Sequence, residues 1–347
     1  MMRCFQGDRK MKHGKKCKID KYTLILIVLL LLLTGLVIAW KLPQKEDRYI
    51  HVGIAVYDRS DTFMESYIRE LEDKIGQTRI LGKKVSYEIY DAEGIGSRQE
   101  KQLQEMYAQD YDVMLVNLVE PASAAGVLTD AKDADIPVIL FNREIDEKDL
   151  KISKNVWYVG TDARAAGVMQ GKLLKDLWKK QSRILDWNGN GMLDYVLVEG
   201  EESHFDAIRR TSGFLETGAE LPLNQKGNIL AEWKRELAYE KFAALDDEAV
   251  QNVEAVICNN DDMALGVYDY YKEKNLKLPV IIGINNSEEM HQKIMSGEMY
   301  GTIDNKMEDQ VMEICRLMQA ILKKDTGSYQ KVWYSTPKAI VKAEGTE

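Results

Sequence analysis

Residues 50–75, IHVGIAVYDRSDTFMESYIRELEDKI, contain the pattern that decides the fold. An apolar, largely β-branched run at 50–56 is followed by a short polar stretch, and apolar residues then recur at helical spacing from 63 to 75. A short apolar run of this kind predicts a buried strand, and apolar residues every three or four positions predict an amphipathic helix. The stretch is therefore predicted to be a strand that leads into a helix, which is the repeating unit of α/β proteins.

The same alternation continues along most of the chain. The other predicted strands share short apolar runs and lie at 85–90, 113–116, 138–141, 156–159, 195–198, 253–257 and 280–284. The clearest helical patterns between them lie at 98–108, 163–177, 262–273 and 306–322. A chain of 347 residues is long enough for two domains, and about ten strands are more than one compact sheet usually holds. We therefore expect an α/β fold with two doubly wound parallel sheets.

The first 40 residues differ from the rest in charge and hydropathy. Eight Lys or Arg against two Asp give residues 1–21 a charge of +6, which leaves −15 for the remainder of a chain whose net charge is −9. Residues 22–40 are uncharged and, as a helix, would span about 28 Å, close to the ~30 Å hydrocarbon core of a bilayer. The positive-inside rule then predicts a basic cytoplasmic segment, a transmembrane anchor and an exported remainder on the extracytoplasmic face of the cell membrane.

A cleaved signal peptide is the alternative interpretation of residues 22–40, with Val37-Ile38-Ala39 as a small-residue cleavage site. The exported part would then be secreted or periplasmic. An uncleaved anchor is favoured because the apolar run is long for a signal peptide. On the exported side, Cys258 and Cys315 lie in apolar patterns and are predicted to be buried thiols.

The composition excludes several classes of function. A body with a charge of −15 repels nucleic-acid phosphates, so we exclude nucleic-acid binding. The chain has no G-x-x-x-x-G-K-[ST] or G-x-S-x-G motif, and its four histidines are too scattered to build a zinc site. A glycoside hydrolase remains as an alternative, because Asp61, Glu144 and Asp206 could converge across a cleft. The predominance of amides favours holding a ligand over transforming it.

Polar side chains follow the predicted strands at the ends where open α/β sheets place their ligand sites. The stretches share carboxylates and uncharged amides and occupy 57–63, 142–144, 199–206, 259–261, 285–286 and 302–305. Phe63 and Trp233 add planar apolar surfaces, and Asp61, Asp206 and Arg210 can form charge-assisted hydrogen bonds. A sugar ring combines CH-rich faces with a rim of hydroxyls, so this set favours a sugar over an apolar or phosphorylated ligand.

Each of these residues also has a purely structural interpretation. Asp61 and Asp206 stand where helix N-caps are expected. The amides of Asn142, Asn260 and Asn285 suit turns. Taken singly, the structural interpretation is favoured. Their joint placement favours a binding site, because unrelated turn residues need not all suit one class of ligand.

A second motif, DWNGNGMLD at 186–194, matches the D-x-[DN]-x-[DN]-G start of a calcium-binding loop. Gly191 supplies the sharp turn, but the twelfth position is Leu197, where such loops have a bidentate glutamate. An Asn-Gly-rich surface turn is the alternative, and calcium is favoured because four side chains and the glycine are in register. The candidate oxygen ligands are Asp186, Asn188, Asn190, the Met192 carbonyl and Asp194.

These segments together resemble the type I periplasmic sugar-binding proteins, and in particular the members that bind galactose and glucose. The resemblance extends from about residue 50 to about residue 337 and rests on pieces such as VGIAVYDRSDTFM, IPVILFNRE, EGEESHFDAIRR, EAVICNNDDMALG and GTIDN. It implies two lobes, one formed by 48–161 with 305–337 and the other by 162–304 with 338–347. Three crossings of the chain, near residues 161, 304 and 337, would join the lobes as a hinge.

The resemblance also implies roles for individual residues. The family's aromatic residues at the positions of Phe63 and Trp233 stack on the sugar, and Glu254 matches a distant carboxylate that completes the calcium site. Asn285 is a departure, since the family has an aspartate there and an amide lacks the carboxylate's charge. The remaining polar sugar ligands implied are Asp61, Asn142, His204, Asp206, Arg210, Asn260 and Asn305.

The function implied by the resemblance is not enzymatic. The two lobes would close around one monosaccharide of the galactose or glucose type and deliver it to an ABC permease. A membrane-anchored sugar sensor for a two-component kinase or a chemoreceptor is the alternative, because the predicted anchor at 22–40 departs from a soluble periplasmic protein. The amide at Asn285 leaves the preferred monosaccharide open.

Overall fold

The computed structural model describes residues 49–245 and 250–342, together with residues 21–23, 26, 30, 32 and 34. The predicted cytoplasmic and transmembrane segments therefore lie almost wholly outside the described residues. Within the described part of the chain, no helix is both long and apolar enough to cross a membrane. Tyr49–Glu347 forms a compact unit of its own, apart from Met1–Arg48. The strands and hydrophobic core clusters of the described residues lie within Tyr49–Glu347, so a fragment that begins near residue 46 contains this complete fold.

Seven strands form the first sheet, namely β1 (Tyr49–Val56), β2 (Arg79–Ile80), β3 (Lys83–Asp91), β4 (Val113–Val116), β5 (Val138–Phe141), β6 (Val156–Thr161) and β12 (Val332–Ser335). Their spatial order is β12-β6-β5-β4-β1-β3-β2, and they pair in parallel except for the antiparallel β2–β3 edge. The four helices that cover this sheet are α2 (Thr62–Gln77), α3 (Gly96–Tyr107), α4 (Ala124–Asp133) and α11 (Met307–Leu322).

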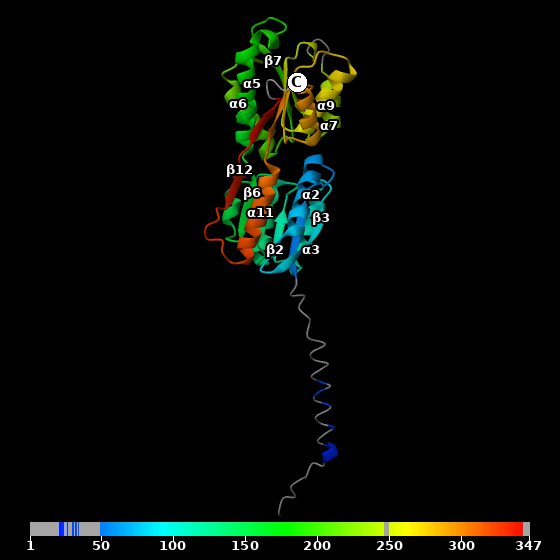
Figure 1. Ribbon diagram of the computed structural model, residues 1–347, viewed down its shortest axis with the longest axis vertical. Helices are drawn as coiled ribbons and strands as arrows, with labels where there is room; N and C mark the ends of the chain where they lie inside the picture. Colours follow the sequence, from blue (N-terminus) through cyan, green and yellow to red (C-terminus); the bar gives the residue numbers. More distant parts are fainter. Residues whose placement is uncertain are drawn as a thin grey trace, which may run out of the picture. The chain divides into compact units, whose positions relative to one another are not determined.

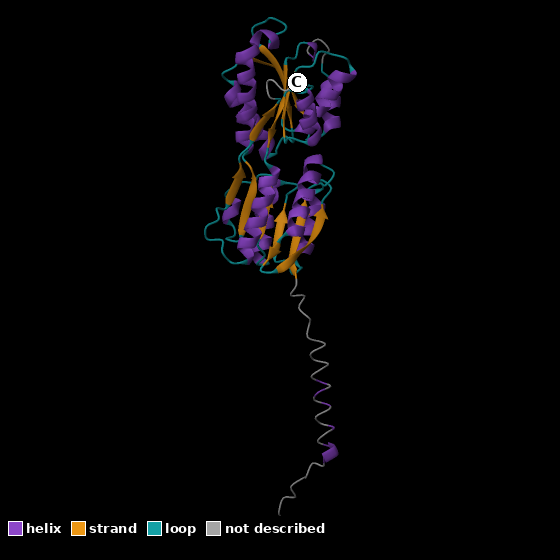
Figure 2. Ribbon diagram, viewed as in Figure 1, coloured by secondary structure: helices purple, strands orange, loops and turns teal. Residues whose placement is uncertain are grey.

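Helices cover both faces of the first sheet (Figures 1 and 2). Val52, Ile54 and Val56 of β1 join the core beneath α2 and α11, whereas Ala55 between them joins the core beneath α3 and α4. Both sides of the strand are therefore buried, which explains why its sequence is apolar without interruption.

Six strands form the second sheet, namely β7 (Leu193–Glu199), β8 (Leu223–Leu230), β9 (Ala255–Cys258), β10 (Val280–Ile284), β11 (Gly301–Asp304) and β13 (Lys338–Val341). Their order is β13-β11-β10-β9-β7-β8, and only the β11–β13 pair is antiparallel. The covering helices are α5 (Ala163–Leu185), α6 (Phe205–Gly218), α7 (Arg235–Ala243), α9 (Asp261–Glu273) and α10 (Glu288–Ser296). α5 and α6 cover one face, and the other three cover the opposite face. Two doubly wound sheets, as predicted, build two lobes.

The sequence patterns missed several elements at the margins of these sheets. β8 reads LNQKGNIL and shows no apolar run, because it lies at the edge of the second sheet and much of it is exposed. β13 was missed because it is a short, partly exposed edge strand. β2, β12, α4, α7 and α10 were also not among the predicted elements. Cys258 in β9 and Cys315 in α11 are buried and free, which confirms the prediction of two buried thiols.

The chain passes between the two sheets three times, between β6 and α5, between β11 and α11, and between β12 and β13. Buried polar groups join the three crossings. The Asn305 carbonyl accepts hydrogen bonds from Thr161 Oγ1 at 2.9 Å and from Ser335 Oγ at 2.7 Å. Gln310 Nε2 donates to the same carbonyl at 2.9 Å and to Thr161 Oγ1 at 2.8 Å. These four residues are named the hinge cluster below.

Two glycines let α5 and α6 lie in close contact beside the second sheet. A Cβ atom on Gly167 would lie 1.9 Å from the Arg210 carbonyl oxygen, and one on Gly213 would lie 2.2 Å from the Arg164 carbonyl oxygen. Only glycine allows two backbones to approach so closely. This contact fixes the position of α6, the helix that carries Arg210.

Candidate ligand-binding site

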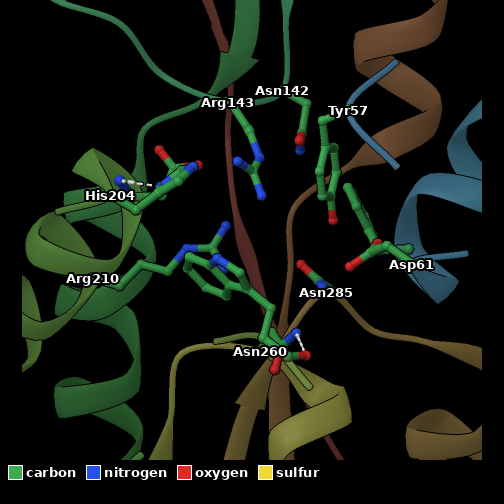
Figure 3. A pocket seen from close by; sticks show the side chains of 11 residues that line it. Tyr57, Asp61, Asn142, Arg143, His204, Arg210, Asn260 and Asn285 are labelled. Atoms are coloured by element: carbon green, nitrogen blue, oxygen red, sulfur yellow. Dashed lines mark hydrogen bonds between the residues drawn. The ribbon is translucent and has the colours of Figure 1, made fainter. Parts of the chain in front are cut away.

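A pocket lies between the two lobes, at the carboxyl ends of the strands (Figure 3). The space that its walls leave free of protein atoms is about 370 Å³, including the part that is open to solvent. This size suits a small ligand. Residues after β1 and β5 line it from the first lobe, and residues after β7, β8, β9 and β10 line it from the second. They are Tyr57, Asp61, Phe63, Asn142, Arg143, His204, Asp206, Arg210, Trp233, Asn260 and Asn285.

Nine of the ten residues predicted as sugar ligands line this pocket. The tenth, Asn305, follows β11 and is buried beside the pocket. Its Nδ2 donates to Asn285 Oδ1 at 2.8 Å, and its Oδ1 has no hydrogen-bond partner among the described residues. Glu144, the third carboxylate of the hydrolase alternative, does not line the pocket. It binds Tyr334 Oη at 2.5 Å and forms an ion pair with Arg209 of α6.

In the first lobe, Asp61 has both of the roles that its sequence position allows. Its Oδ1 accepts a hydrogen bond from the Met64 amide at 2.8 Å, so it is the N-cap of α2, and its side chain also lines the pocket. Asn142 has a left-handed backbone with a φ of 64°, a conformation that asparagine tolerates well. Its Oδ1 accepts from Asn117 Nδ2 at 3.3 Å.

In the second lobe, His204 is the N-cap of α6, in the place where Asp206 was the alternative prediction. His204 Nδ1 accepts from the Asp206 amide at 3.1 Å, so the ring proton lies on Nε2. Burial, together with the nearby cations Arg143 and Arg210, lowers the pKa of His204 to about 2. The imidazole is therefore neutral in the physiological pH range. Its buried Nε2 has no partner in the described part of the chain.

Asp206 and Arg210 lie one turn apart on α6, and both are buried. Burial raises the pKa of Asp206, while the charge of Arg210 lowers it. Arg210 Nη1 donates to the Asn259 carbonyl at 2.6 Å. Asp206 Oδ1 and Arg210 Nε have no hydrogen-bond partner among the described residues. Buried polar atoms of this kind are rare in folded proteins, and a ligand or water bound here would satisfy them.

Trp233 forms an aromatic wall of the pocket. Its backbone has a φ of 67°, and a Cβ atom on Gly200 would lie 2.3 Å from the indole, so the ring packs directly on the Gly200 backbone. The His204 ring meets it edge-on, with 5.3 Å between the centroids. The side chain of Asn260, the N-cap of α9, donates to the Trp233 carbonyl at 3.0 Å and holds this turn in place. The Arg210 guanidinium lies 5.4 Å from the ring centroid.

Tyr57 and Arg143 are pocket residues that the sequence analysis missed. The Arg143 guanidinium lies 3.8 Å from the centroid of the Tyr57 ring, and Arg143 Nη1 donates to the Val119 carbonyl at 2.6 Å. Burial raises the pKa of Tyr57 well above its usual value, and the charge of Asp61 adds to this effect. Both residues belong to the polar stretches after strands, which was the available signal. An arginine is usually solvated, so its 6% exposure was not predictable from the sequence.

The predicted calcium loop has turns that bring its side-chain oxygens inward. Asp186 Oδ2 accepts from the Gly191 amide at 3.0 Å, and Asn190 Oδ1 accepts from the Met192 amide at 2.7 Å. Glu254, distant in sequence, accepts from the Asp194 amide at 2.9 Å. Glu254 therefore lies at the loop.

The donor set of this loop is mixed. The side-chain amides of Asn188 and Asn190 both donate to Asp194 Oδ2, at 3.0 and 3.3 Å. Asp186 Oδ1 is buried and has no partner within the described residues. In the same part of the chain, no three His, Cys, Asp or Glu side chains are arranged to hold a metal. Oxygen atoms of amides, a carbonyl and carboxylates fit calcium, and the buried unpartnered oxygen of Asp186 is consistent with such an ion.

Comparison with known proteins agrees with this architecture. Residues 52–326 match the family described as periplasmic binding protein domain, so the chain belongs to the type I periplasmic sugar-binding proteins, as its motifs predicted. The D-galactose/methyl-galactoside binding periplasmic protein of Haemophilus influenzae is 30% identical over 290 residues, which are 81% of this chain and 84% of the relative. The galactofuranose-binding protein of Escherichia coli is 27% identical over 248 residues, or 69% and 74% of the two chains.

Solved structures share the fold. A solute-binding protein of an ABC transporter from Actinobacillus succinogenes, with bound D-allose, superposes with a TM-score of 0.73 at 19% identity and covers 84% of this chain and 97% of its own. The myo-inositol binding protein of Caulobacter has a TM-score of 0.71 at 23% identity, with 84% and 93% covered. At these identities the similarity shows the fold alone.

Proposed function

We propose that this protein binds one neutral monosaccharide, of the galactose or glucose type, in the pocket between its lobes. The observation that carries the proposal is a set of buried polar atoms that have no partner among the described residues and lie beside the indole of Trp233, namely His204 Nε2, Asp206 Oδ1 and Arg210 Nε. A hydroxyl both donates and accepts, so neighbouring sugar hydroxyls can satisfy all three atoms. The relatives named above, which bind galactosides and galactofuranose, support this ligand class.

The charges around the pocket favour a neutral ligand. Arg210 is balanced by Asp206 on the same helix, and Arg143 forms an ion pair with Glu201 at 2.9 Å. Asp61 adds a further carboxylate to the pocket. No excess of positive charge is therefore available for a phosphate or a carboxylate on the sugar. The alternative of a glycoside hydrolase is weakened because Glu144 does not line the pocket, and one of its oxygens binds Tyr334 and Arg209.

Binding would be completed by closure of the lobes about the hinge cluster. Contacts between the lobes are already present, since Thr62 Oγ1 of α2 donates to Asp262 Oδ2 of α9 at 2.5 Å. Phe63 approaches the ligand from the first lobe and Trp233 from the second, so only the closed form can offer both aromatic surfaces. A ligand that contacts both lobes shifts the equilibrium towards closure by that difference in binding free energy.

Asn285 would adjust which sugar is preferred. The side-chain amides of Asn285 and Asn305 form one hydrogen bond with each other, which uses one amide oxygen and one amide hydrogen of the pair. The pair keeps amide hydrogens for the ligand, whichever way the two amides are oriented, whereas an aspartate at 285 would present only oxygens. The sugar group that meets Asn285 can therefore be bound through its own lone pair, which changes the preference among epimers.

Calcium is proposed as the second ligand of this protein. Asp186, Asn188, Asn190, the Met192 carbonyl, Asp194 and Glu254 would hold it. The ion would join the loop before β7 to the residue before β9 and stiffen the second lobe. It would take no part in sugar recognition, because none of these residues lines the pocket.

The closed form would deliver the sugar to an ABC permease, with the protein held on the extracytoplasmic face of the membrane by residues 22–40. A membrane-anchored sugar sensor that signals to a two-component kinase or a chemoreceptor is a second candidate. The observation in its favour is the uncharged run at 22–40 behind a basic segment, which suits a tethered receptor.

Calorimetric titration of a fragment that begins at residue 46 tests the binding proposal. Galactose, glucose, ribose and xylose are each titrated, with and without calcium. We expect saturable one-to-one heat with galactose or glucose, and loss of that heat in Trp233→Ala. Trp178→Ala, which removes an indole of α5 in the same lobe outside the pocket, is the matched control and should bind normally. Absence of heat with all four sugars would contradict the proposal.

A further inference from the structure

Glu201, in the loop after β7, links the two lobes at the pocket. Its Oε1 accepts a hydrogen bond from Arg143 Nη2 of the first lobe at 2.9 Å. The same oxygen accepts from Trp233 Nε1 of the second lobe at 3.1 Å. One carboxylate oxygen therefore joins a cation of one lobe to the aromatic wall of the other.

The two donors are held on their other sides as well. Arg143 lies against Tyr57 and donates to the Val119 carbonyl, so its guanidinium has a fixed direction. The Trp233 ring lies on the Gly200 backbone, next to Glu201 in the chain. Among the described residues, Glu201 is the only carboxylate that forms an ion pair with Arg143. The position of Glu201 therefore depends on both lobes.

We infer that Glu201 is a positioning residue that couples closure of the lobes to the orientation of Trp233. The inference rests on the proposed sugar-binding function and deepens it. Glu201 and Trp233 belong to the same lobe, so their hydrogen bond persists when the lobes part. Arg143 reaches the carboxylate only on closure, and its charge then fixes the oxygen that holds the indole.

The ion pair between Arg143 and Glu201 should stabilise the closed form more than the open form. Arg143 is only 6% exposed when the lobes meet, so it has lost most of its water. A buried cation without a carboxylate partner is costly, whereas the same cation is solvated in the open form. Loss of Glu201 should therefore destabilise the closed form selectively. An ordinary exposed ion pair would contribute little and would not discriminate between the two forms.

A double-mutant cycle tests the coupling through sugar affinity. Glu201→Ala and Arg143→Met should each weaken binding about three- to tenfold, and the double variant should be no weaker than the worse single variant. Effects that multiply in the double variant would overturn the inference. Glu202→Ala is the matched control, because Glu202 is an exposed glutamate of the same loop. It should bind like the unmodified protein.

Trp233→Phe tests the other half of the link. Phenylalanine keeps an aromatic face but lacks the N–H that donates to Glu201. This variant should weaken binding in the presence of Glu201 and have no further effect in the Glu201→Ala background. An equal loss in both backgrounds would show that only the size of the ring matters. Circular dichroism of the ligand-free Glu201→Ala variant should show an intact fold, so that its loss of affinity reports the coupling and not unfolding.

A ligand-free measurement separates this inference from the proposed function. Cysteines introduced at Glu105 of the first lobe and Lys274 of the second, both exposed, can carry a fluorescent donor and acceptor, since Cys258 and Cys315 are buried. Glu201→Ala and Arg143→Met should lower the closed fraction of the 46–347 fragment to the same extent. An unchanged distribution in Glu201→Ala would overturn the inference, whether or not the tested sugars bind. Failure of sugar binding with a shifted distribution would contradict only the choice of ligand.

Discussion

The hinge cluster and the pocket both contain buried polar side chains, but they differ in how these are satisfied. At the hinge, Gln310 and Ser335 donate to the Asn305 carbonyl, so the crossing strands satisfy one another. In the pocket, buried atoms of Asp206 and Arg210 have no partner among the described residues. Burial of polar groups is therefore not in itself a sign of a binding site. Buried groups with hydrogen-bond partners stabilise the fold. Buried groups without partners destabilise it, and a ligand that supplies the missing hydrogen bonds removes this destabilisation.

Asn305 belongs to both regions. Its backbone carbonyl is the common acceptor of the hinge cluster, and its side chain binds Asn285 of the pocket. A ligand that binds Asn285 is therefore connected to the hinge cluster through a single residue, Asn305. This arrangement places ligand recognition and the hinge in direct contact.

The largest expected effect is the loss of sugar affinity on Asp206→Asn. The substitution keeps the size of the side chain but removes the charge of the unpartnered acceptor, so affinity should fall by about 100-fold. Titration calorimetry measures it. Asp176→Asn, an exposed aspartate of α5, is the control. Unaltered affinity in Asp206→Asn would mean that the unpartnered oxygen does not face the ligand. The proposed difference between the pocket and the hinge cluster would then be wrong.

The unpartnered oxygen of Asp186 extends the comparison to a third region. If calcium satisfies it, chelation should lower the melting temperature by about 5 to 10 °C when the ion had been present at 100 times its dissociation constant. Asp186→Asn should melt at the lower temperature with or without calcium. Scanning calorimetry gives both values. Equal melting temperatures before and after chelation would contradict the proposed calcium site.

At the hinge, Gln310→Ala should act on stability. The variant removes a buried donor to the Asn305 carbonyl and Thr161, which costs about 1 to 3 kcal/mol and lowers the melting temperature by about 3 to 10 °C. The control is Gln319→Ala, a half-buried glutamine of the same helix. Sugar affinity should fall less than in Asp206→Asn. The reverse outcome, a large loss of affinity at normal stability, would place the hinge cluster among the binding groups.

Glu144 is intermediate, because Tyr334 and Arg209 bind one of its oxygens while the other has no partner in the described part of the chain. Burial raises its pKa to about 7, and the nearby charge of Asp206 contributes. A carboxyl group whose pKa is higher in the folded state contributes stability at low pH, and this contribution is lost as the pH rises towards 7. Asp261, with a pKa also raised to about 7, acts in the same direction.

Glu144→Gln should therefore flatten, without abolishing, the fall in melting temperature between pH 5 and pH 7.5. This is the smallest of the expected effects. Melting curves at several pH values measure it, with Glu147→Gln, an exposed glutamate of the same loop, as control. A slope identical to that of the unmodified protein would show that Glu144 is fully satisfied and belongs with the hinge.

Much of the pocket followed from the sequence, because the ends of parallel strands meet at one edge of a sheet. Asp61 and Asn285 stand in the polar stretches that follow apolar runs, so their placement needed only the order of the strands. Tyr57, Arg143 and Glu201 stand in the same stretches and were not selected. Their importance comes from contacts across the two lobes, and no local pattern records such contacts.

The sequence by itself determined the alternation of strand and helix, the two sheets and the edge at which the polar residues gather. These follow from the spacing of apolar residues, which is a local property of the chain. Only the tertiary structure decided which polar groups are satisfied and which are not. Hydrogen bonds such as those of the hinge cluster join residues far apart in sequence, so burial and partnership appear only once the lobes are folded and facing each other.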